Sequence, residues 1–199
     1  MQIRILTEEQ VHLALPMREA IEAMKEAFRQ LSAGNASMPL RTGIDVTDQE
    51  GVAFFMPALL HTTRDLAVKI VSVFPRNSYL ELPTIHAVVV AIDPDTGRPL
   101  ALIEGGSLTA IRTGAASGAA TDLLARPDAR RVAIFGSGVQ ARTQLEAVCA
   151  VRDIDEAWVY STDREGAQNF AEELAGKGPI PHEITVAAEP AEALAAADV

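Results

Sequence analysis

The sequence predicts an α/β protein in which an antiparallel sheet precedes the first half of a parallel, doubly wound sheet. Short β-type runs without helical periodicity fill residues 41–104. An apolar strand then runs directly into a glycine-rich turn at residues 131–141. Strands and helices alternate from this turn to the last residue, which is the pattern of a parallel sheet covered by helices.

The composition is that of a globular protein that can bury a core, since 48% of the 199 residues are hydrophobic and 22% are charged. A formal net charge of -10 argues against nucleic acid as a partner, because phosphate binding needs clustered Lys and Arg. The single cysteine, Cys149, excludes a disulfide framework. No apolar run approaches the ~18 residues of a membrane span, and the first residues do not resemble a signal peptide. We therefore expect a cytoplasmic protein without a membrane partner.

The first 35 residues predict a short strand at residues 3–6 and two helices. Thr7 and Gln10 stand three residues apart, the spacing of a capping box that begins a helix. A longer helix follows and should end at Gly34-Asn35. Its apolar residues recur at intervals of three and four: Ile21, Met24, Phe28 and Leu31.

The middle of the chain predicts an antiparallel sheet. Its strands are expected at residues 41–46, 52–56, 66–74, 85–92 and 99–104. Residues 93–97 read Asp-x-Asp-x-Gly, like the start of a calcium loop, but Pro94 and the lack of a glutamate at the far end favour a plain hairpin turn.

Residues 107–125 are rich in Ala, Gly, Ser and Thr and predict a helix with little side-chain bulk. Gly114 and Gly118 stand four apart, so another backbone can come close to this face. Ser107 or Thr109 is the expected N-cap. We interpret this segment as a hinge helix between two domains.

The glycine-rich turn spells G-x-G-x-x-A at Gly136, Gly138 and Ala141. Its strand–turn–helix setting is that of a Rossmann dinucleotide fingerprint. Gly136 would permit the tight turn, Gly138 would let a pyrophosphate approach the backbone, and Ala141 would let the helix pack on the strand. Strand and helix units continue in register after the turn, which favours dinucleotide binding over a glycine turn in an unrelated sheet.

The second strand of this sheet ends in a segment that would read the adenosine ribose. An acidic residue there favours NAD, whereas small or basic residues tolerate the 2′-phosphate of NADP. The segment offers a hydroxyl, a carboxylate and a guanidinium, so the residues leave NAD and NADP both open as the cofactor. The expected cofactor contacts are Gly136, Ser137, Gly138, Val139, Gln140, Ala141, Ser161, Asp163 and Arg164.

From about Met38 onward the sequence resembles the ornithine cyclodeaminase and mu-crystallin family, which includes certain alanine dehydrogenases and ketimine reductases. Five segments in the family's order carry this resemblance: 38–41 (MPLR), 55–57 (FMP), 69–75 (KIVSVFP), 108–115 (LTAIRTGA) and 136–141 (GSGVQA). The resemblance implies a substrate-binding and dimerisation domain at residues 1–106, an incomplete Rossmann domain at residues 107–199, and a homodimer.

The resemblance also implies hydride transfer between NAD(P) and the Cα of a small amino or cyclic imino acid. In this interpretation Arg41 and Arg112 hold the substrate carboxylate, since a guanidinium fork places Cα against the nicotinamide. Lys69 binds the substrate at the reacting centre. It is also the catalytic residue, able to act as acid or base if burial lowers its pKa. Met56 matches a pocket wall, and Thr113 a cofactor contact.

Several functions remain open on this scaffold. Ornithine cyclodeamination, alanine dehydrogenation and ketimine reduction use the same groups, and the sequence does not choose among them. A second hypothesis is a protein that binds NAD(P)H or a small ligand without turnover, as mu-crystallin-like proteins suggest. Lys69 beside an anion clamp favours the enzyme, because a binding protein has no need for a proton-transfer group there.

Residues 195–199 look like the start of a fourth parallel strand. Without that strand, residues 132–135 would keep a bare apolar edge. We therefore expect a fragment of a longer enzyme, inactive alone, whose catalytic aspartate lies further on. The four histidines lack metal-type spacing, so no metal is expected, and Phe135, Trp158 and Cys149 are interpreted as packing residues.

Overall fold

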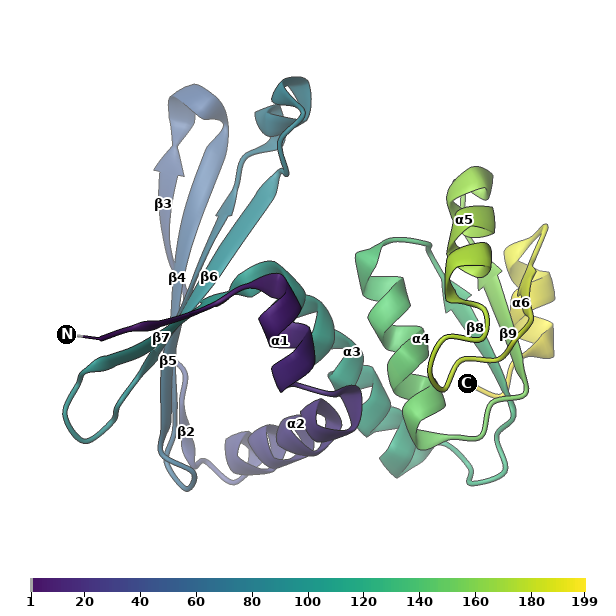
Figure 1. Ribbon diagram of the computed structural model, residues 1–199, viewed down its shortest axis with the longest axis horizontal. Coiled ribbons are helices and arrows are strands. Elements are labelled where there is room, and N and C mark those ends of the chain that lie inside the picture. Colours follow the sequence, from purple (N-terminus) through teal and green to yellow (C-terminus); the bar gives the residue numbers. More distant parts are fainter. Residues whose placement is uncertain (1) are drawn as a thin grey trace. The chain divides into compact units, whose positions relative to one another are not determined.

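The computed structural model describes residues 2–199, which form two compact units (Figure 1). The first unit comprises residues up to Leu15 and Glu26–Thr109, and the second comprises Pro16–Lys25 and Ala110–Val199. Two helices contribute to both units: α2 (Met17–Ser32) and α3 (Gly105–Leu124). The domain limits expected from the sequence stay a prediction; this grouping differs from them by placing the start of α2 in the second unit and the first turn of α3 in the first.

The first unit is built on a seven-stranded sheet with the order β1-β7-β6-β5-β4-β2, in which β3 also pairs with β4. Its strands are β1 (Arg4–Leu6), β2 (Ala36–Ser37), β3 (Thr42–Val46), β4 (Gly51–Leu60), β5 (Asp65–Val73), β6 (Ile85–Ile92) and β7 (Pro99–Glu104). The expected antiparallel sheet is confirmed, and all pairings are antiparallel except that of β1 with β7. β1 can run parallel to β7 because the two are far apart in the chain and no hairpin joins them.

Two short 3₁₀ helices, η1 (Thr47–Gln49) and η2 (Pro75–Leu80), lie between strands of this sheet. Helix α1 (Glu8–Ala14) begins as the capping-box spacing predicts, since the backbone N–H of Thr7 donates to the side-chain oxygen of Gln10 at 3.1 Å. Helix α2 ends before Gly34, whose φ of +74° favours glycine. Its buried Gln30 donates to Thr63 and accepts from the backbone N–H of Thr62, which ties α2 to the β4–β5 turn.

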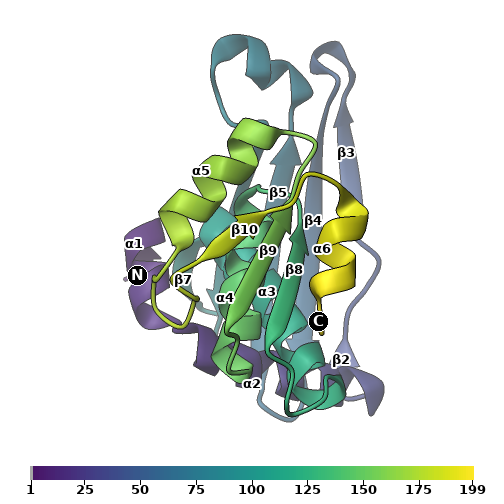
Figure 2. The same ribbon diagram turned by 90° about the vertical axis from the view of Figure 1, so that its right-hand side faces the viewer.

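The second unit contains a parallel three-stranded sheet with the order β10-β9-β8 (Figure 2). Its elements after α3 are β8 (Arg131–Phe135), α4 (Val139–Val151), β9 (Glu156–Tyr160), α5 (Arg164–Leu174), β10 (Ile184–Val186) and α6 (Pro190–Ala196). Helices α4 and α6 lie on opposite sides of this sheet (Figure 1). The fully buried centre of the core consists of Val132, Leu145, Val159 and Phe170. This arrangement is the first half of a Rossmann domain, as the sequence predicts.

The last two residues already pair alongside β8. The N–H of Ala133 donates to the carbonyl of Val199 at 3.0 Å, and the N–H of Asp198 donates to the carbonyl of Arg131 at 2.8 Å. The side chain of Asp198 is 6% exposed and accepts from the backbone N–H groups of Arg130 and Arg131. This pairing is what the expected start of a fourth strand requires.

The start of α3 differs from the expectation of a Ser107 or Thr109 N-cap. The helix begins at Gly105, and the carboxylate of Glu104 accepts the N–H groups of Gly106 and Ser107 at 2.5 and 2.8 Å. Because this carboxylate occupies the helix start, a hydroxyl cap is not needed. Burial alone would raise the pKa of Glu104, but the hydrogen bonds from Ser107 and Gly106 outweigh it, so this pKa is lowered.

The small residues of α3 permit close packing within the second unit, as expected. A Cβ on Gly114 would lie 2.6 Å from the carbonyl carbon of Thr143 in α4. A Cβ on Gly118 would lie 2.7 Å from the side chain of Ile21 in α2. These two positions therefore require glycine for contact with α4 and with the first half of α2.

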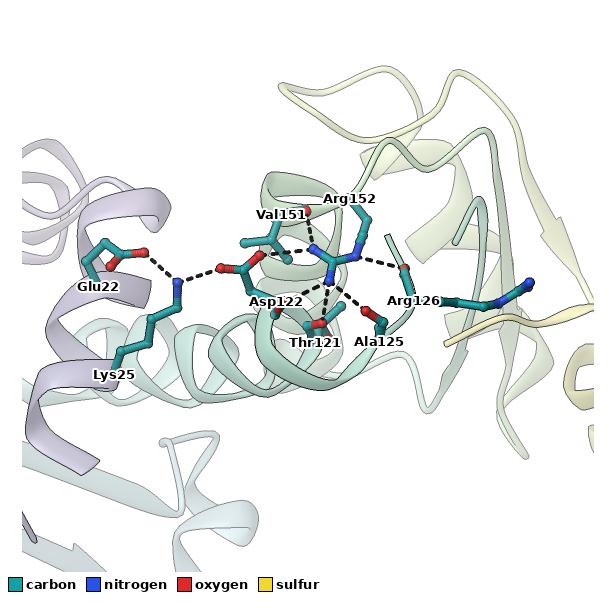
Figure 3. A network of polar contacts seen from close by, with 8 residues as sticks. All are labelled: Glu22, Lys25, Thr121, Asp122, Ala125, Arg126, Val151 and Arg152. Carbon is teal, nitrogen blue, oxygen red and sulfur yellow. Dashed lines mark hydrogen bonds and ion pairs between the residues drawn. The ribbon is translucent and has the colours of Figure 1, made fainter. Parts of the chain in front are cut away.

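A charged network closes the end of α3 (Figure 3). The side chain of Arg152 is only 9% exposed, and its guanidinium donates to the backbone carbonyls of Thr121, Asp122 and Ala125 at 2.8–3.0 Å. The Asp122 carboxylate accepts from Arg152 at 3.0 Å and from Lys25 at 2.5 Å. These hydrogen bonds, that from Lys25 first, lower the pKa of Asp122. Arg152 thus satisfies carbonyls that a helix end leaves without partners.

Within residues 2–199, no helix is both long enough and apolar enough to span a membrane.

Candidate functional site

The glycine turn adopts the geometry that the fingerprint requires. Gly136 has a φ of +105°, a conformation that side chains other than glycine rarely adopt. Its N–H donates to the carbonyl of Tyr160 at 2.7 Å, which holds the turn against the end of β9. Ala141 is buried among the core residues of the unit. Gly136 and Ala141 therefore serve the tight turn and the helix packing, as the sequence predicts.

Gly138 occupies a different environment. It is the N-cap of α4, and a Cβ added to it would meet nothing within 4 Å. No side chain caps the helix start. The end of β8 at Phe135, the glycine turn, and Val139 and Gln140 at the start of α4 line a hollow of about 490 Å³. Uncapped N–H groups at a helix start attract an anion, so these residues fit the diphosphate of a dinucleotide.

The expectation that Phe135 is a packing residue is wrong. Phe135 lines this hollow and is 53% exposed rather than packed in the core. As the last residue of β8, it has its ring 6.3 Å from that of Tyr160. Cys149 is buried, as expected, and burial raises the pKa of its thiol to about 12. Trp158 lies within β9 and is partly exposed.

The turn between β9 and α5 brings Ser161 beside the glycine loop. The hydroxyl oxygens of Ser137 and Ser161 are 3.3 Å apart. The carboxylate of Asp163 accepts the N–H of Gly166 at 2.9 Å and is the N-cap of α5. Arg164, the first residue of α5, is exposed. Of the expected cofactor residues, Thr113 is the one that lies on α3, where it is partly exposed.

Three of the expected substrate residues gather on one face of the sheet in the first unit. Met56 in β4 lies directly opposite Lys69 in β5, and residues opposite each other in an antiparallel pair share a face. Phe54 shares that face because it is two residues from Met56. The guanidinium carbon of Arg41 lies 4.6 Å from the centre of the Phe54 ring. Arg41, Met56 and Lys69 therefore lie together, with Phe54 beneath the guanidinium.

Lys69 contacts a residue that the sequence does not indicate as its partner. Its ammonium donates to the hydroxyl of Thr109 at 2.8 Å, and this hydroxyl donates in turn to the carbonyl of Gly105 at 2.6 Å. Thr109 belongs to the segment 108–115, but the sequence indicates it only as a possible helix cap. Arg112, expected as the second carboxylate ligand, lies on α3 within the second unit and is exposed.

No group of three or more His, Cys, Asp or Glu side chains among residues 2–199 is arranged to hold a metal ion.

Comparison with known proteins decides the family. The sequence model of the ornithine cyclodeaminase/mu-crystallin family matches residues 1–199. The chain belongs to this family. Family membership agrees with the two-part fold, in which an antiparallel-rich sheet precedes parallel Rossmann strands.

Relatives of this family include enzymes whose structures contain a dinucleotide. A Δ1-pyrroline-2-carboxylate reductase of Bacillus cereus is 39% identical over 183 residues, which are 92% of this chain and 56% of the relative. The Δ1-pyrroline-2-carboxylate reductase of Thermococcus litoralis, solved with NADH and L-proline, is 44% identical with a TM-score of 0.88, over 98% of this chain and 60% of that one. An archaeal alanine dehydrogenase dimer with bound NAD is 36% identical with a TM-score of 0.84, over 97% and 58%. The chain thus spans somewhat more than half the length of these relatives.

Proposed function

We propose that this chain carries the substrate-binding and dinucleotide-binding parts of an oxidoreductase that transfers hydride at the Cα of a small amino or cyclic imino acid. The observation that carries the proposal is the space beside Gly138, where a Cβ would meet nothing and the helix start lacks a side-chain cap. A glycine that no neighbour in the chain requires is explained by a ligand that approaches the backbone. The relatives solved with NADH or NAD support a nicotinamide dinucleotide as that ligand.

Different residues would bind the cofactor diphosphate and the substrate carboxylate. Gly136, Gly138 and the N–H groups of α4 would hold the diphosphate. When bound, NAD(P) supplies the hydride acceptor or donor. Arg41 would bind the substrate carboxylate, with its guanidinium over the ring of Phe54. We propose that Arg112 is the second carboxylate ligand.

Lys69 would hold or move the proton at the substrate nitrogen. Its ammonium donates to Thr109, which fixes the position of Nζ on the face that also presents Arg41 and Met56. Met56, 38% exposed, would form the wall against the substrate carbons. The same groups serve the oxidation of an amino acid and the reduction of an imino acid, because the carboxylate and Cα are common to both. Ornithine cyclodeamination stays an alternative that adds a ring closure between these two steps.

The substitution Gly138→Val tests the proposed diphosphate site at the glycine turn. Its side chain would enter open space, so the melting temperature should be unchanged while NADH affinity falls about a hundredfold, as expected for the loss of several hydrogen bonds to a charged group. Fluorescence titration with NADH measures the affinity. Unchanged NADH binding in Gly138→Val would exclude the proposed diphosphate site.

The catalytic proposal is tested by Lys69→Ala in the full-length protein, with the exposed Lys177→Ala as the matched control. Lys69→Ala should lower hydride transfer by about a hundredfold or more while NADH binding is retained, since a proton-transfer residue contributes about this factor. Oxidation of NADH with Δ1-pyrroline-2-carboxylate and reduction of NAD with L-alanine are the assays. An unmodified protein that binds NADH but transfers no hydride would favour the non-catalytic binding protein instead.

We also propose a homodimer in the cytoplasm. The alanine dehydrogenase relative is described as a dimer, and the sheet of the first unit exposes apolar side chains such as Ile44 and Ile85. Sedimentation velocity tests the dimer, which a purely monomeric protein at micromolar concentration would contradict. The reduced, buried thiol of Cys149 accords with a reducing compartment, and cell fractionation would test that location.

A further inference from the structure

The turn between β9 and α5 shows which residue would face the adenosine ribose. In Rossmann domains this position follows the second strand, next to the glycine turn. Here the hydrogen bond from Gly136 to Tyr160 fixes the end of β9 against that turn. Ser161 comes next, with its hydroxyl oxygen 3.3 Å from that of Ser137. The group at the ribose position is therefore a neutral hydroxyl.

The nearby carboxylate of Asp163 is used for another purpose. One oxygen accepts the N–H of Gly166 at 2.9 Å, as the N-cap of α5. The other oxygen lies so close to Gly166 that a Cβ there would collide with it. The carboxylate is thus held against the first turn of α5, where the helix dipole stabilises its negative charge. The carboxylate of Asp163 therefore serves the helix start, and Ser161 is the residue that directly follows β9.

A cation lies at the same turn. Arg164 is exposed, and none of the ion pairs found in residues 2–199 includes it. Ser161 and Thr162 contribute two hydroxyls to the same turn, and the carboxylates of Asp163 and Glu165 flank Arg164 in the chain without pairing with it. A guanidinium together with hydroxyl donors is the chemistry that binds a phosphate monoester. A carboxylate at the ribose position would repel such a group, and Ser161 does not.

We propose that the β9–α5 turn selects NADP(H) over NAD(H), with Ser161 and Arg164 as the specificity-determining residues. The proposal rests on the dinucleotide site of the proposed function and names the cofactor that this site prefers. Arg164 would pair with the 2′-phosphate, and Ser161 would donate to it. The relatives solved with NADH or NAD make a preference for NAD(H) the competing result.

Titration of the full-length protein with NADPH and with NADH tests the selection, because both report binding by fluorescence. NADPH should bind about tenfold more tightly, the gain expected from one charge-assisted pair. Calorimetry with 2′,5′-ADP and with ADP isolates the 2′-phosphate itself and should favour 2′,5′-ADP.

Variants assign the preference to residues. Ser161→Asp should reverse the order by weakening NADPH and strengthening NADH. Arg164→Ala should weaken NADPH about tenfold and leave NADH unchanged, whereas Arg164→Lys should keep most of the NADPH affinity. Arg98→Ala, which removes an exposed arginine of the first unit, is the control and should change neither. Asp163→Asn keeps an oxygen for the helix cap and should not weaken NADH.

The outcomes separate this proposal from the one on which it rests. Equal or tighter binding of NADH, an unchanged order in Ser161→Asp, or a loss of NADH affinity in Asp163→Asn would overturn the selection while the dinucleotide site stands. Failure of both NADPH and NADH to bind would overturn the proposed function, and the selection with it.

Discussion

Arg152 in the second unit and Arg41 in the first have opposite surroundings. In the second unit Arg152 is nearly buried and donates to helix carbonyls and to Asp122, which also accepts from Lys25 (Figure 3). In the first unit the exposed Arg41 has its guanidinium over the Phe54 ring, on the sheet face where the Lys69 ammonium donates to the Thr109 hydroxyl. The first arrangement neutralises charge within the fold, whereas Arg41 lies over an uncharged ring, where we propose that it binds an anionic ligand. We therefore expect Arg152 to stabilise the structure and Arg41 to contribute to binding.

The two units also differ in how completely their apolar side chains are buried. The core of the second unit contains side chains with no measurable exposure, such as Leu145 and Phe170. The strands of the first unit keep apolar side chains partly exposed, and Met56 is an example. Substitutions in the second unit should therefore change stability most, and substitutions on the sheet face of the first should change binding.

The largest loss of stability is expected for Gly114→Val. Its side chain would collide with the backbone of Thr143 and separate α3 from α4, at a cost of about 3 kcal/mol. Urea unfolding followed by fluorescence measures this, because the single tryptophan, Trp158, lies in the second unit. Ala120→Leu, on an exposed position of the same helix, should change stability by less than about 0.5 kcal/mol. Similar values for the two variants would contradict the close packing of α3.

Arg152→Met should follow with a loss of about 2 kcal/mol, because it leaves several helix carbonyls without their donor and takes away one of the two donors to the Asp122 carboxylate. The control is Arg130→Met, whose guanidinium lies 3.5 and 3.9 Å from two exposed carboxylates. Exposed pairs contribute little, so this variant should lose less than about 1 kcal/mol. The comparison between the units would fail if Arg152→Met were no more costly than Arg130→Met.

Sequence reasoning located the glycine turn and most strands because these features are local. Gly136, Gly138 and Ala141 are within six residues and sit directly between a strand and a helix. The role of Asp163 had a local signal that was available, since an aspartate before a helical run is a preferred N-cap. The cap of α3 by Glu104 lacked such a signal, because glutamate is not among the favoured N-cap residues.

Long-range contacts could not be predicted in this way. The hydrogen bond from Lys69 to Thr109 joins residues 40 positions apart, and that from Arg152 to Asp122 joins residues 30 apart. Nothing in the spacing or composition distinguishes Arg152 from Arg41, although one is nearly buried and the other exposed. The division of cations between structure and binding depends on the tertiary fold.

Acid should weaken the second unit through Asp198. Backbone N–H donation from Arg130, followed by the guanidinium of Arg131, lowers the pKa of this carboxyl well below its usual range. A carboxyl with a lowered folded-state pKa stabilises the fold above its unfolded pKa of about 3.9, and this contribution disappears as the pH falls through the folded value. The free energy of unfolding should therefore decline below about pH 4, and Asp198→Asn should flatten that decline. Asp155→Asn, at an exposed position, is the control. If the free energy of unfolding keeps the same pH dependence in Asp198→Asn, the Asp198 carboxylate is not the cause of the decline.

The smallest effect on stability, and the sharpest test of the comparison, is expected for Arg41→Met. The variant removes only an exposed contact with the Phe54 ring, so the free energy of unfolding should fall by less than about 1 kcal/mol. Affinity for L-proline should nevertheless fall more than about tenfold, because the proposed carboxylate ligand is lost. Calorimetric titration of the NADH-loaded protein measures the affinity. Arg64→Met, which breaks an exposed pair with Asp95 in the same unit, should change neither quantity appreciably. If Arg41→Met keeps its affinity for L-proline, the position of Arg41 over an uncharged ring does not identify it as a substrate ligand. The difference between the two units would then be one of packing alone.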